Sequence, residues 1–449
     1  MSELYEKSTA KLELGGVLEK LAGCACSEAA KAACLYLRPN SDLEDVKELL
    51  AQTTAACNLV AVKGTPSFQD VKEVGAALER ADRGGSLSTV ELLRIAGVLR
   101  CARSIKSYCE PEERPAVLAP LFAELTPNRR LEDRIFTSIL SEEEIADAAS
   151  STLADIRRHM RQQSAKIRDG LQKIISSPSY AKYLRDPIIT IRQDRYVVPV
   201  KSEFKNEVPG LVHDVSATGS TFFVEPMSAV NANNALRELQ LKEKKEIERI
   251  LAELSAEAAA LREIISQDYA VLTRLDVIFA KARLSYEMRA GEPLMNNEGK
   301  IELKKARHPL IDPKKVVPIS LRLGTDFDSM IITGPNTGGK TVTLKTIGLL
   351  TLMAECGLHV PAGDGSCLST FDLVLADIGD EQSIQQSLST FSSHMRTIVD
   401  VVAQCDSRSL VLFDELGAGT DPAEGAALAV ALIEFCRKMG SRVAATTHY

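Results

Sequence analysis

The sequence predicts a mixed fold in three parts. These are an all-α core, a pair of long antiparallel lever helices that carry a small antiparallel β module, and an α/β domain of the P-loop type. Three observations support this prediction. Apolar residues recur three and four positions apart over most of residues 1–292. A stretch inside that region is rich in β-branched residues and is broken by Pro and Gly. From residue 293 onward, short apolar strands alternate with helices around a glycine-rich motif.

The first helical part covers residues 1–140, where turn signals such as "RPNSD" and "DRGGS" separate amphipathic pieces. We expect residues 141–180 to form the first lever helix. Its start is predicted by a capping box, in which Ser141 is followed three residues later by Glu144. Its end is predicted by Pro178.

The β module is predicted at residues 181–226, where "PIITIRQDRYVVPVKSE" and "PGLVHDVSATGSTFFVEP" read as short strands. The second lever helix is predicted at residues 227–292, because neither Pro nor Gly occurs between Pro226 and Gly291. At 1.5 Å per residue such a helix could reach roughly 90 Å. Matching apolar stripes on the two helices predict an antiparallel arm with the β module at its tip.

Composition excludes several classes of protein. The formal net charge of −7 excludes a uniformly basic nucleic-acid binder, so such contacts need a local patch. Trp is absent and aromatic residues make up 5%, which argues against a stacking platform for single strands. The ten cysteines form no CxxC pair and no zinc-type cluster. With a polar start and no apolar run long enough for a membrane span, we expect a cytoplasmic protein without membrane partners.

The α/β domain is predicted at residues 293–449, and its glycine-rich motif "GPNTGGKT" follows an apolar strand and opens a helix. This is the context of a phosphate-binding loop, in which backbone N–H groups face the phosphates of a nucleotide such as ATP. Lys340 should reach the β- and γ-phosphates, and the Thr341 hydroxyl should bind Mg²⁺. The expected nucleotide-binding residues are Gly334, Pro335, Asn336, Thr337, Gly338, Gly339, Lys340 and Thr341.

Two carboxylates follow the apolar strand "SLVLF". Burying one acidic residue at a strand end is costly, so two in succession favour a Walker B motif. We expect Asp414 to hold Mg²⁺ and Glu415 to orient or deprotonate the attacking water. His448 follows a later apolar strand and is predicted to sense the γ-phosphate, with a purely structural histidine as the alternative. Lys340, Glu415 and His448 are therefore the catalytic candidates.

A hydroxyl-rich stretch, "STFSSHM" at residues 389–395, lies between the two motifs. We expect a turn before a helix, where Ser389, Thr390 and Ser392 offer hydroxyls and backbone N–H groups to an anion. One interpretation is an ordinary N-cap. The other is a turn that closes over the γ-phosphate bound to a second copy, so that ATP holds a head-to-tail homodimer together.

These motifs, with "GLHVPA" at 357–362 and "ARHPL" at 306–310, resemble the MutS superfamily of ATPases, whose α/β domain is of the ABC/MutS type. The resemblance places His308 near the nucleotide base. "LKTIGLL" and the β-module sequence resemble the bacterial MutS-II subfamily, in which that module is a clamp. This implies binding of branched DNA with suppression of recombination, or splitting of stalled or collided ribosomes. Mismatch recognition is not expected, because there is no room before the helical core for the domain that reads mismatches in mismatch-repair members. The resemblance also implies a nuclease activity confined to a C-terminal Smr domain, so we expect an N-terminal fragment that ends inside the ATPase domain.

Candidate contacts with nucleic-acid backbone come from basic residues on the first lever helix and the β module. A charge run on a helix is usually a solvated face, but on an acidic chain it is the best candidate for phosphate contacts. The candidates are Arg157, Arg158, Arg161, Lys166, Arg168, Arg192, Arg195, Lys201 and Lys205. The alternative function is a structural coiled-coil ABC-type ATPase of the chromosome-cohesion class. Its motifs are split between the chain ends and include an LSGGQ-like signature, which "STFSSHM" is not.

Overall fold

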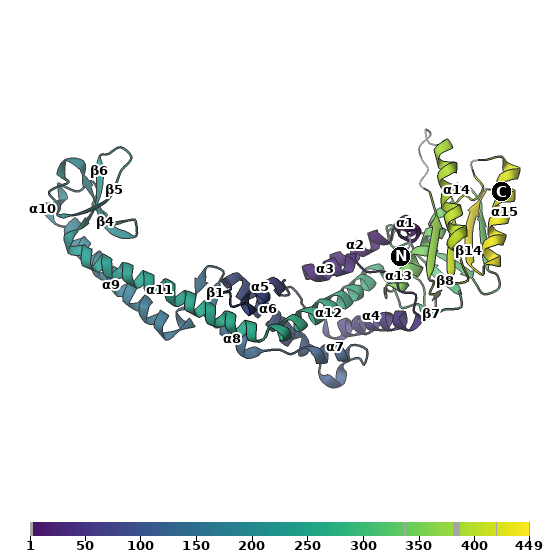
Figure 1. Cartoon of the computed structure of the whole chain (residues 1–449), viewed down its shortest axis with the longest axis horizontal. Coiled ribbons are helices and arrows are strands. Elements are labelled where there is room, and N and C mark those ends of the chain that lie inside the picture. The colour runs from purple at the N-terminus through teal and green to yellow at the C-terminus, as the bar shows by residue number, and fades with distance from the viewer. Residues whose placement is uncertain (1–2, 336–337, 380–386, 419, 449) are drawn as a thin grey trace. The chain divides into compact units, whose positions relative to one another are not determined.

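A computed structural model describes residues 3–335, 338–379, 387–418 and 420–448, with the side chains of α14 from His394 onward. The chain divides into two compact units (Figure 1). Unit 1 contains Met1–Lys72, Cys101–Pro127 and Gln267–Tyr449. Unit 2 contains Glu73–Arg100 and Asn128–Ser266.

Unit 2 is built around two long antiparallel helices, α9 and α11, which lie side by side in Figure 1. Their buried faces carry apolar residues at helical spacing, which explains why the stripe was visible in the sequence. The helices of this unit are α5 (Gly75–Asp82), α6 (Thr89–Lys106, which continues into unit 1), α8 (Arg129–Ser138), α9 (Ser151–Ile175), α10 (Pro178–Ala181) and α11 (Met227–Ala260). Short 3-10 turns lie at η2 (Asp147–Ala149) and η3 (Ser202–Phe204).

Helix α9 begins ten residues later than its capping-box letters suggested, so the predicted start at Ser141 is wrong. Residues 139–145 form a small hairpin of strands β1 (Ile139–Ser141) and β2 (Glu144–Ile145). The Ser141 hydroxyl accepts the N–H of Glu143 inside this hairpin instead of capping a helix. The true N-cap is Ser150, whose hydroxyl oxygen accepts the N–H of Leu153 at 2.9 Å.

The second lever helix was predicted as one element, and the structure shows two. Helix α11 ends at Ala260, and α12 (Arg262–Met288) follows after Leu261, which has φ −109° and ψ 12°. The Leu261 N–H donates to Ala258, which closes α11 with a tightened last turn. No proline or glycine marks this break, so the sequence pattern could not reveal it.

The predicted β module is confirmed as a four-stranded antiparallel sheet with the order β3-β4-β6-β5. The strands are β3 (Thr190–Arg192), β4 (Arg195–Lys201), β5 (Gly210–Val215) and β6 (Thr221–Pro226). Val198 and Val224 share a core with residues of α9 and α11, so the sheet packs on the ends of both helices. Glu225 is fully buried, where its carboxylate meets Arg195 at 3.0 Å and His213 at 2.5 Å.

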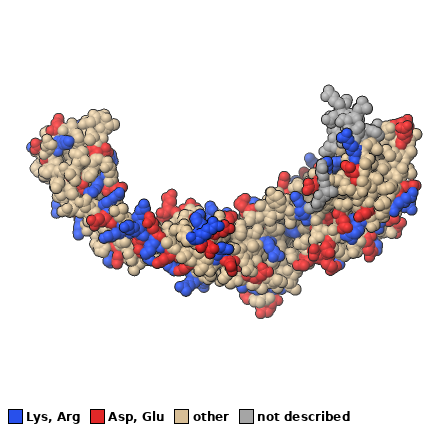
Figure 2. Space-filling model, in the orientation of Figure 1, with Lys and Arg blue, Asp and Glu red and all other residues tan. Residues whose placement is uncertain are grey.

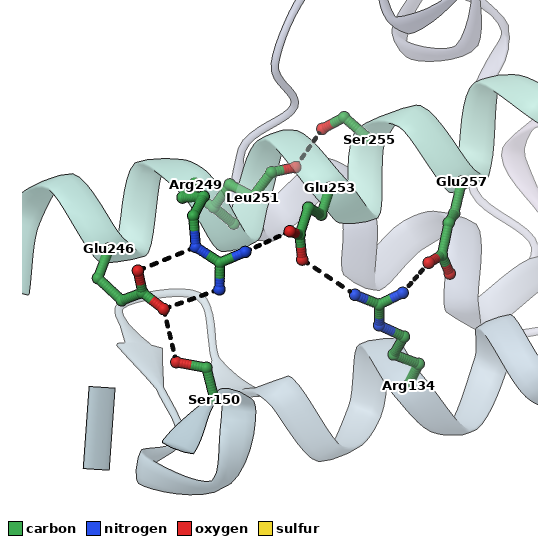
Figure 3. Close-up of polar contacts among 8 residues, drawn as sticks. All are labelled: Arg134, Ser150, Glu246, Arg249, Leu251, Glu253, Ser255 and Glu257. Carbon is green, nitrogen blue, oxygen red and sulfur yellow. Dashed lines mark hydrogen bonds and ion pairs between the residues drawn. The ribbon is translucent and has the colours of Figure 1, made fainter. Parts of the chain in front are cut away.

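A chain of ion pairs joins α8 to α11 (Figure 3). Arg249 contacts Glu246 at 2.8 Å and also pairs with Glu253. Arg134 of α8 contacts Glu253 at 3.2 Å and also pairs with Glu257. Hydrogen bonds from Arg249 hold the pKa of Glu246 down to about 2. The network therefore ties the middle of α11 to the helix beside it.

Unit 1 combines N-terminal helices with two sheets. Its helices are α1 (Glu3–Lys11), α2 (Leu14–Cys24), α3 (Glu28–Leu35), α4 (Leu43–Lys63), α7 (Ala119–Glu124), most of α12, α13 (Lys340–Glu355), α14 (Ser387–Gln404) and α15 (Pro422–Lys438), with a 3-10 turn at η1 (Pro111–Glu113). One sheet has the order β7-β11-β8-β9, with strands Leu294–Asn296, Cys367–Ser369, Ile301–Ala306 and Ile319–Leu323. The described helices include none that is both long and apolar enough to cross a membrane.

The second sheet is parallel and has the order β10-β14-β13-β12. Its strands are β10 (Ser329–Thr333), β14 (Arg442–Thr447), β13 (Ser409–Phe413) and β12 (Leu373–Asp377). Along β13, Leu410 and Leu412 join the core with α13, whereas Val411 and Phe413 join the core with α14 and α15. Helices therefore cover both faces, as expected for buried parallel strands.

The N-terminal helix is part of this α/β unit, although the sequence placed residues 1–140 in a separate helical core. Leu4 of α1 lies in the same core cluster as Ile398 of α14. The buried Ser8 hydroxyl accepts the N–H of Ala376 on β12 at 3.0 Å. Helix α1 thus packs against the edge strand of the parallel sheet.

Candidate nucleotide site

The glycine-rich loop connects β10 to α13, as the motif predicted. Gly334 has φ 140° and Gly339 has φ 75°, backbone conformations that L side chains rarely adopt. Gly338 does not need such a conformation, and Asn336 and Thr337 lie outside the described residues. A Cβ atom at Gly334 or Gly339 would meet no heavy atom within 4 Å, so both of these positions face open space.

Lys340 is the first residue of α13, and its side chain folds back over the loop. It is buried to 5% exposure, and its Nζ donates to the Gly334 carbonyl at 2.7 Å. The same Nζ lies 3.4 Å from Nδ1 of His448. Thr341 follows in the first turn of the helix and is half-buried. The loop therefore presents a cation and a hydroxyl at the N-terminus of a helix, where anions are favoured.

The two acidic residues follow β13, between β12 and β14 in the sheet. Asp414 is buried, and its Oδ1 accepts the Thr446 hydroxyl at 2.5 Å. The backbone N–H of Glu415 donates to the oxygen of that same hydroxyl at 2.7 Å. Glu415 has φ 50°, a left-handed conformation that is uncommon for residues other than glycine. Strain of this kind at a strand end is typical of functional sites.

His448 lies between the loop and the acidic pair. Its Nε2 is 3.3 Å from Oε1 of Glu415, while its Nδ1 faces Lys340. The structure thus brings the three catalytic candidates, Lys340, Glu415 and His448, into one continuous chain of contacts. The sequence predicted these three residues as candidates but not the contacts between them.

The hydroxyl-rich segment is helical, so the predicted turn before a helix is wrong. Residues 389–395 belong to α14, which already begins at Ser387. The side chains of Ser389, Thr390 and Ser392 lie outside the described residues, so their predicted roles stay predictions. His394 is described, and its Nδ1 lies 2.9 Å from Oδ2 of Asp377.

His308 is buried close to α13, which is compatible with its predicted place near a nucleotide base. Its Nδ1 accepts the N–H of Leu310 at 3.4 Å, and burial lowers its pKa, which favours the neutral ring. Its buried Nε2 has no hydrogen-bond partner among the described residues. Glu13 lies 3.9 Å from that nitrogen and pairs with Lys345 of α13 at 3.1 Å. An orphan ring nitrogen beside the helix that follows the loop is suited to a polar ligand atom.

Together these residues fit a nucleotide with a magnesium ion. The loop offers open space, a lysine and a helix N-terminus for phosphates, and Asp414 and Thr341 offer oxygen donors. Among the described residues no group of three or more His, Cys, Asp or Glu side chains could hold a metal ion by itself. Mg²⁺ is usually held by one or two protein ligands, water and substrate phosphates, and Asp414 and Thr341 are ligands of that kind.

Comparison with known proteins shows which family this chain resembles. Residues 330–449 match the family described as MutS domain V. The chain is 50% identical over 450 residues to a protein named Endonuclease MutS2 from Acetivibrio thermocellus, and 49% identical over 449 residues to one from Ruminiclostridium cellulolyticum. Both matches cover 99% of this chain.

The chain belongs to the MutS-II subfamily. It spans 57% of the length of each of these relatives. The same share holds for a third relative of the same name from Clostridium botulinum, with 49% identity.

Two of the basic candidates of this MutS-II chain are engaged in internal ion pairs. Arg157 meets Glu243 at 2.7 Å and Asp147 at 2.8 Å, and its side chain is 21% exposed. Arg195 is held by the buried carboxylate of Glu225 and is 22% exposed. Their charges are compensated inside unit 2, so they are poor candidates for contact with phosphates.

The other basic candidates lie at the surface of unit 2. Arg158 and Arg161 are more than half exposed, although each has an acidic neighbour. Three basic side chains lie over aromatic rings, namely Arg168 over Tyr196, Arg192 over Phe223 and Lys205 over Phe222. Lys166 is exposed, and Lys201 donates to the Lys182 carbonyl at 3.2 Å.

A groove of about 610 Å³ runs along α9 and is lined by Arg157, Arg161 and Arg168. On the face shown in Figure 2, basic and acidic side chains are interspersed and no single basic surface stands out. The structure therefore places some of the predicted arginines beside one another, but acidic side chains lie among the basic ones on this surface.

Sequence reasoning missed the role of Thr446, which contacts both Walker B carboxylate residues. Its hydroxyl oxygen joins β14 to β13, two strands whose pairing no local motif reveals. Asp377 was also missed, although "LVLAD" ends an apolar strand in an acid, as "LVLFD" does. This shared pattern in the sequence could have identified Asp377 as a candidate site residue.

Proposed function

We propose that this MutS-II chain is an ATPase that binds ATP with Mg²⁺ at residues 334–341 and hydrolyses it. The observation that carries the proposal is the contact chain from Lys340 through His448 to Glu415, with Asp414 beside it. A phosphate-binding lysine, a candidate general base and a polar residue between them are the groups that phosphoryl transfer to water requires.

The roles follow from the positions of the atoms. Lys340 would exchange its bond to the Gly334 carbonyl for phosphate oxygens. Asp414, oriented by the Thr446 hydroxyl, would hold Mg²⁺ together with Thr341. When bound, the ion would supply positive charge to the phosphates. Glu415 would accept a proton from the attacking water, and His448 would hold its position between that carboxylate and the phosphate site.

We further propose that the chain acts as a homodimer. Helix α14 would present its first turns, with Ser389, Thr390 and Ser392, to the γ-phosphate bound by the other copy. Bound ATP would then stabilise the dimer, and its hydrolysis would release the interface. The α9–α11 pair of unit 2 would serve as a lever and its β module as a clamp.

Two variants test the ATPase. Lys340→Ala removes the phosphate-binding cation and is expected to abolish binding of a fluorescent ATP analogue. Glu415→Gln is expected to bind ATP, to accumulate as a dimer in light scattering, and to lose turnover by about 10²–10⁴-fold. Tight ATP binding by Lys340→Ala, or undiminished turnover by Glu415→Gln, would refute the assignment.

The macromolecule moved by this ATPase is proposed from its family. The candidates are branched DNA, where binding would suppress recombination, and stalled or collided ribosomes, whose subunits would be split. Exposed basic residues on α9 and the β module, such as Arg158, Arg161 and Lys166, would contact the phosphate backbone without reading sequence. The ten cysteines are thiols outside any disulfide, which supports a place in the reducing cytoplasm.

The deciding experiment uses the Glu415→Gln chain, arrested with ATP and crosslinked in cells, followed by sequencing of the recovered nucleic acid. Mostly ribosomal RNA would identify the ribosome, and mostly chromosomal DNA would identify DNA. Changing Arg158, Arg161 and Lys166 to Glu should weaken recovery and lower the salt dependence of binding. Lys47→Glu, which alters an exposed lysine on α4 of unit 1, serves as the charge-altering control.

A further inference from the structure

Asp377 is a buried carboxylate with one partner on each oxygen. It ends β12, and its side chain is 3% exposed. Its Oδ1 accepts from Nζ of Lys11 at 3.3 Å, and its Oδ2 lies 2.9 Å from Nδ1 of His394. Lys11 is the last residue of α1, and His394 lies two turns into α14. One carboxylate therefore connects the N-terminal helix with the helix that carries the hydroxyl-rich segment.

The same residue is joined to the acidic pair of the nucleotide site. The backbone carbonyl of Asp377 accepts the N–H of Asp414 at 2.9 Å, one step beyond the paired strands β12 and β13. A second bond holds α1 to β12, between the Ser8 hydroxyl and Ala376. Any shift of α14 against the sheet thus acts on a residue bonded directly to Asp414.

Packing alone does not explain an aspartate at this position. A buried carboxylate costs free energy unless it is paired and hydrogen-bonded, and an apolar residue of similar volume would avoid that cost. The division of partners between two helices has a specific consequence. If α14 moves away, His394 leaves Oδ2, while Lys11 on Oδ1 still compensates the charge of Asp377. The carboxylate can therefore release one helix without becoming an isolated buried charge.

We propose that Asp377 is a positioning residue that fixes α14 against the parallel sheet, with Lys11 as its permanent counter-charge and His394 as its releasable partner. The N-terminal helix α1 is then a working part of the nucleotide site, although it is separated from Asp377 by most of the chain. This inference rests on the proposed ATPase function for its effect on turnover. It does not rest on that function for its effect on α14 itself.

The first test measures amide hydrogen exchange of the nucleotide-free chain. Asp377→Ala and Lys11→Met should each speed exchange in residues 395–404 of α14 by about tenfold or more, the loss expected for one hydrogen bond to a charged group. Helix α15 should be unaffected. Lys47→Met on α4, which removes an exposed lysine paired with Glu44, is the matched control. Unchanged exchange in α14 for both variants would overturn the proposal, and Lys11→Met keeps the test valid if Asp377→Ala does not fold.

The second test asks whether Lys11 and His394 act through the same carboxylate. We expect Lys11→Met and His394→Gln to lower kcat while the affinity for a fluorescent ATP analogue stays within about twofold, because both residues act through Asp377 and not through the phosphate-binding Lys340. The two effects should be non-additive in the double variant and absent from an Asp377→Ala background. Lys11→Arg should restore kcat. If the double variant loses kcat by the product of the two single fold-changes, the proposal is overturned.

The two tests separate failure of this inference from failure of the proposed function. If the unaltered chain neither binds nor hydrolyses ATP, the function fails, while the exchange of α14 still decides the role of Asp377. If turnover is normal and hydrogen exchange of α14 is the same in the Asp377 variant as in the unaltered chain, the function stands and the positioning role is wrong.

Discussion

One hydroxyl group, that of Thr446, organises both acidic residues of the candidate site. It donates to Asp414 and accepts from the N–H of Glu415. The next backbone group follows the same strand, since Leu416 N–H donates to the Thr446 carbonyl at 2.8 Å. Hydrogen bonds to strand β14 therefore hold the turn at Glu415 in its left-handed conformation.

We predict that Thr446→Val will destabilise unit 1 and impair ATP hydrolysis. Valine fills the same volume but leaves the buried Asp414 carboxylate without this partner, at a cost of about 1–3 kcal/mol, and also removes the acceptor of the part-buried Glu415 N–H. Urea unfolding measures the stability, and a coupled assay measures turnover as a function of Mg²⁺ concentration. Thr446→Ser keeps the hydroxyl and should retain most of both. A Val variant as stable and active as the unaltered chain would show that the hydroxyl is dispensable.

Glu355, the last residue of α13, is a buried carboxyl group outside the site. Its Oε1 accepts the N–H of Phe371 at 2.9 Å, and burial raises its pKa well above the ordinary value. Folding therefore favours the protonated form. The stability from this group is fully present below the unfolded pKa of about 4.3 and is lost as the pH rises toward the folded value.

We accordingly predict that Glu355→Gln will stabilise the chain more at pH 8 than at pH 5. Glutamine keeps the acceptor for Phe371 and has no proton to lose. Urea unfolding at both pH values gives the difference in the free energy of unfolding. Glu48→Gln, at an exposed position on α4, should show no such trend. A difference from the unaltered chain that is constant with pH would contradict the prediction.

At the level of residues, the sequence was sufficient where chemistry depends on local spacing. The candidate phosphate loop from Gly334 to Thr341 and the candidate pair Asp414 and Glu415 could be named from the sequence because each motif lies within a few consecutive residues. The partners of those residues come from other strands. The bond between Thr446 and Asp414 crosses two paired strands, and the bond between His394 and Asp377 joins a helix to an edge strand.

Elements were predicted well in type and less well in their ends. Apolar spacing indicated two long helices, and β-branched residues with Pro and Gly indicated a small antiparallel β module, whose four strands only the structure shows. Helix boundaries depend on single hydrogen bonds that several residues can make. Ser150 rather than Ser141 caps α9, and α11 ends at an ordinary leucine. The positions of these helix ends depend on packing against neighbouring elements, which the local sequence does not reveal.

The ion-pair network between α8 and α11 predicts a pH dependence of the stability of unit 2. Because the folded pKa of Glu246 is depressed to about 2, its contribution is present above the unfolded pKa and is lost as the pH falls toward 2. Glu246→Gln should therefore reduce stability at pH 7 and have no effect near pH 2. Unfolding followed by circular dichroism measures this, with the exposed Glu248→Gln as control. An equal loss at both pH values would show that packing, and not charge, is responsible.

For the whole molecule, the division into two units predicts where ATP stabilises the chain. The loop, the acidic pair and His448 all lie in unit 1, so only that unit gains binding free energy. At an ATP concentration of 100 times Kd, the gain is about 2.7 kcal/mol. Hydrogen exchange of β13 should slow accordingly, while exchange of β4 and β6 in unit 2 stays unchanged. Lys340→Ala should abolish the effect, and equal slowing of both units would show that they unfold together.

The position of α1 also determines when, during synthesis of the protein, this helix can be buried. Ser8 and Ala376 are separated by 368 residues, yet they are bonded in the buried edge of the parallel sheet. At roughly 5–20 residues per second, the N-terminal helix leaves the ribosome about 20–70 s before its partner strand exists. Residues 73–266, which contain unit 2, are completed in that interval. The first helix to be made is therefore among the last to be buried, and its apolar face must be shielded from aggregation until the nucleotide site is complete.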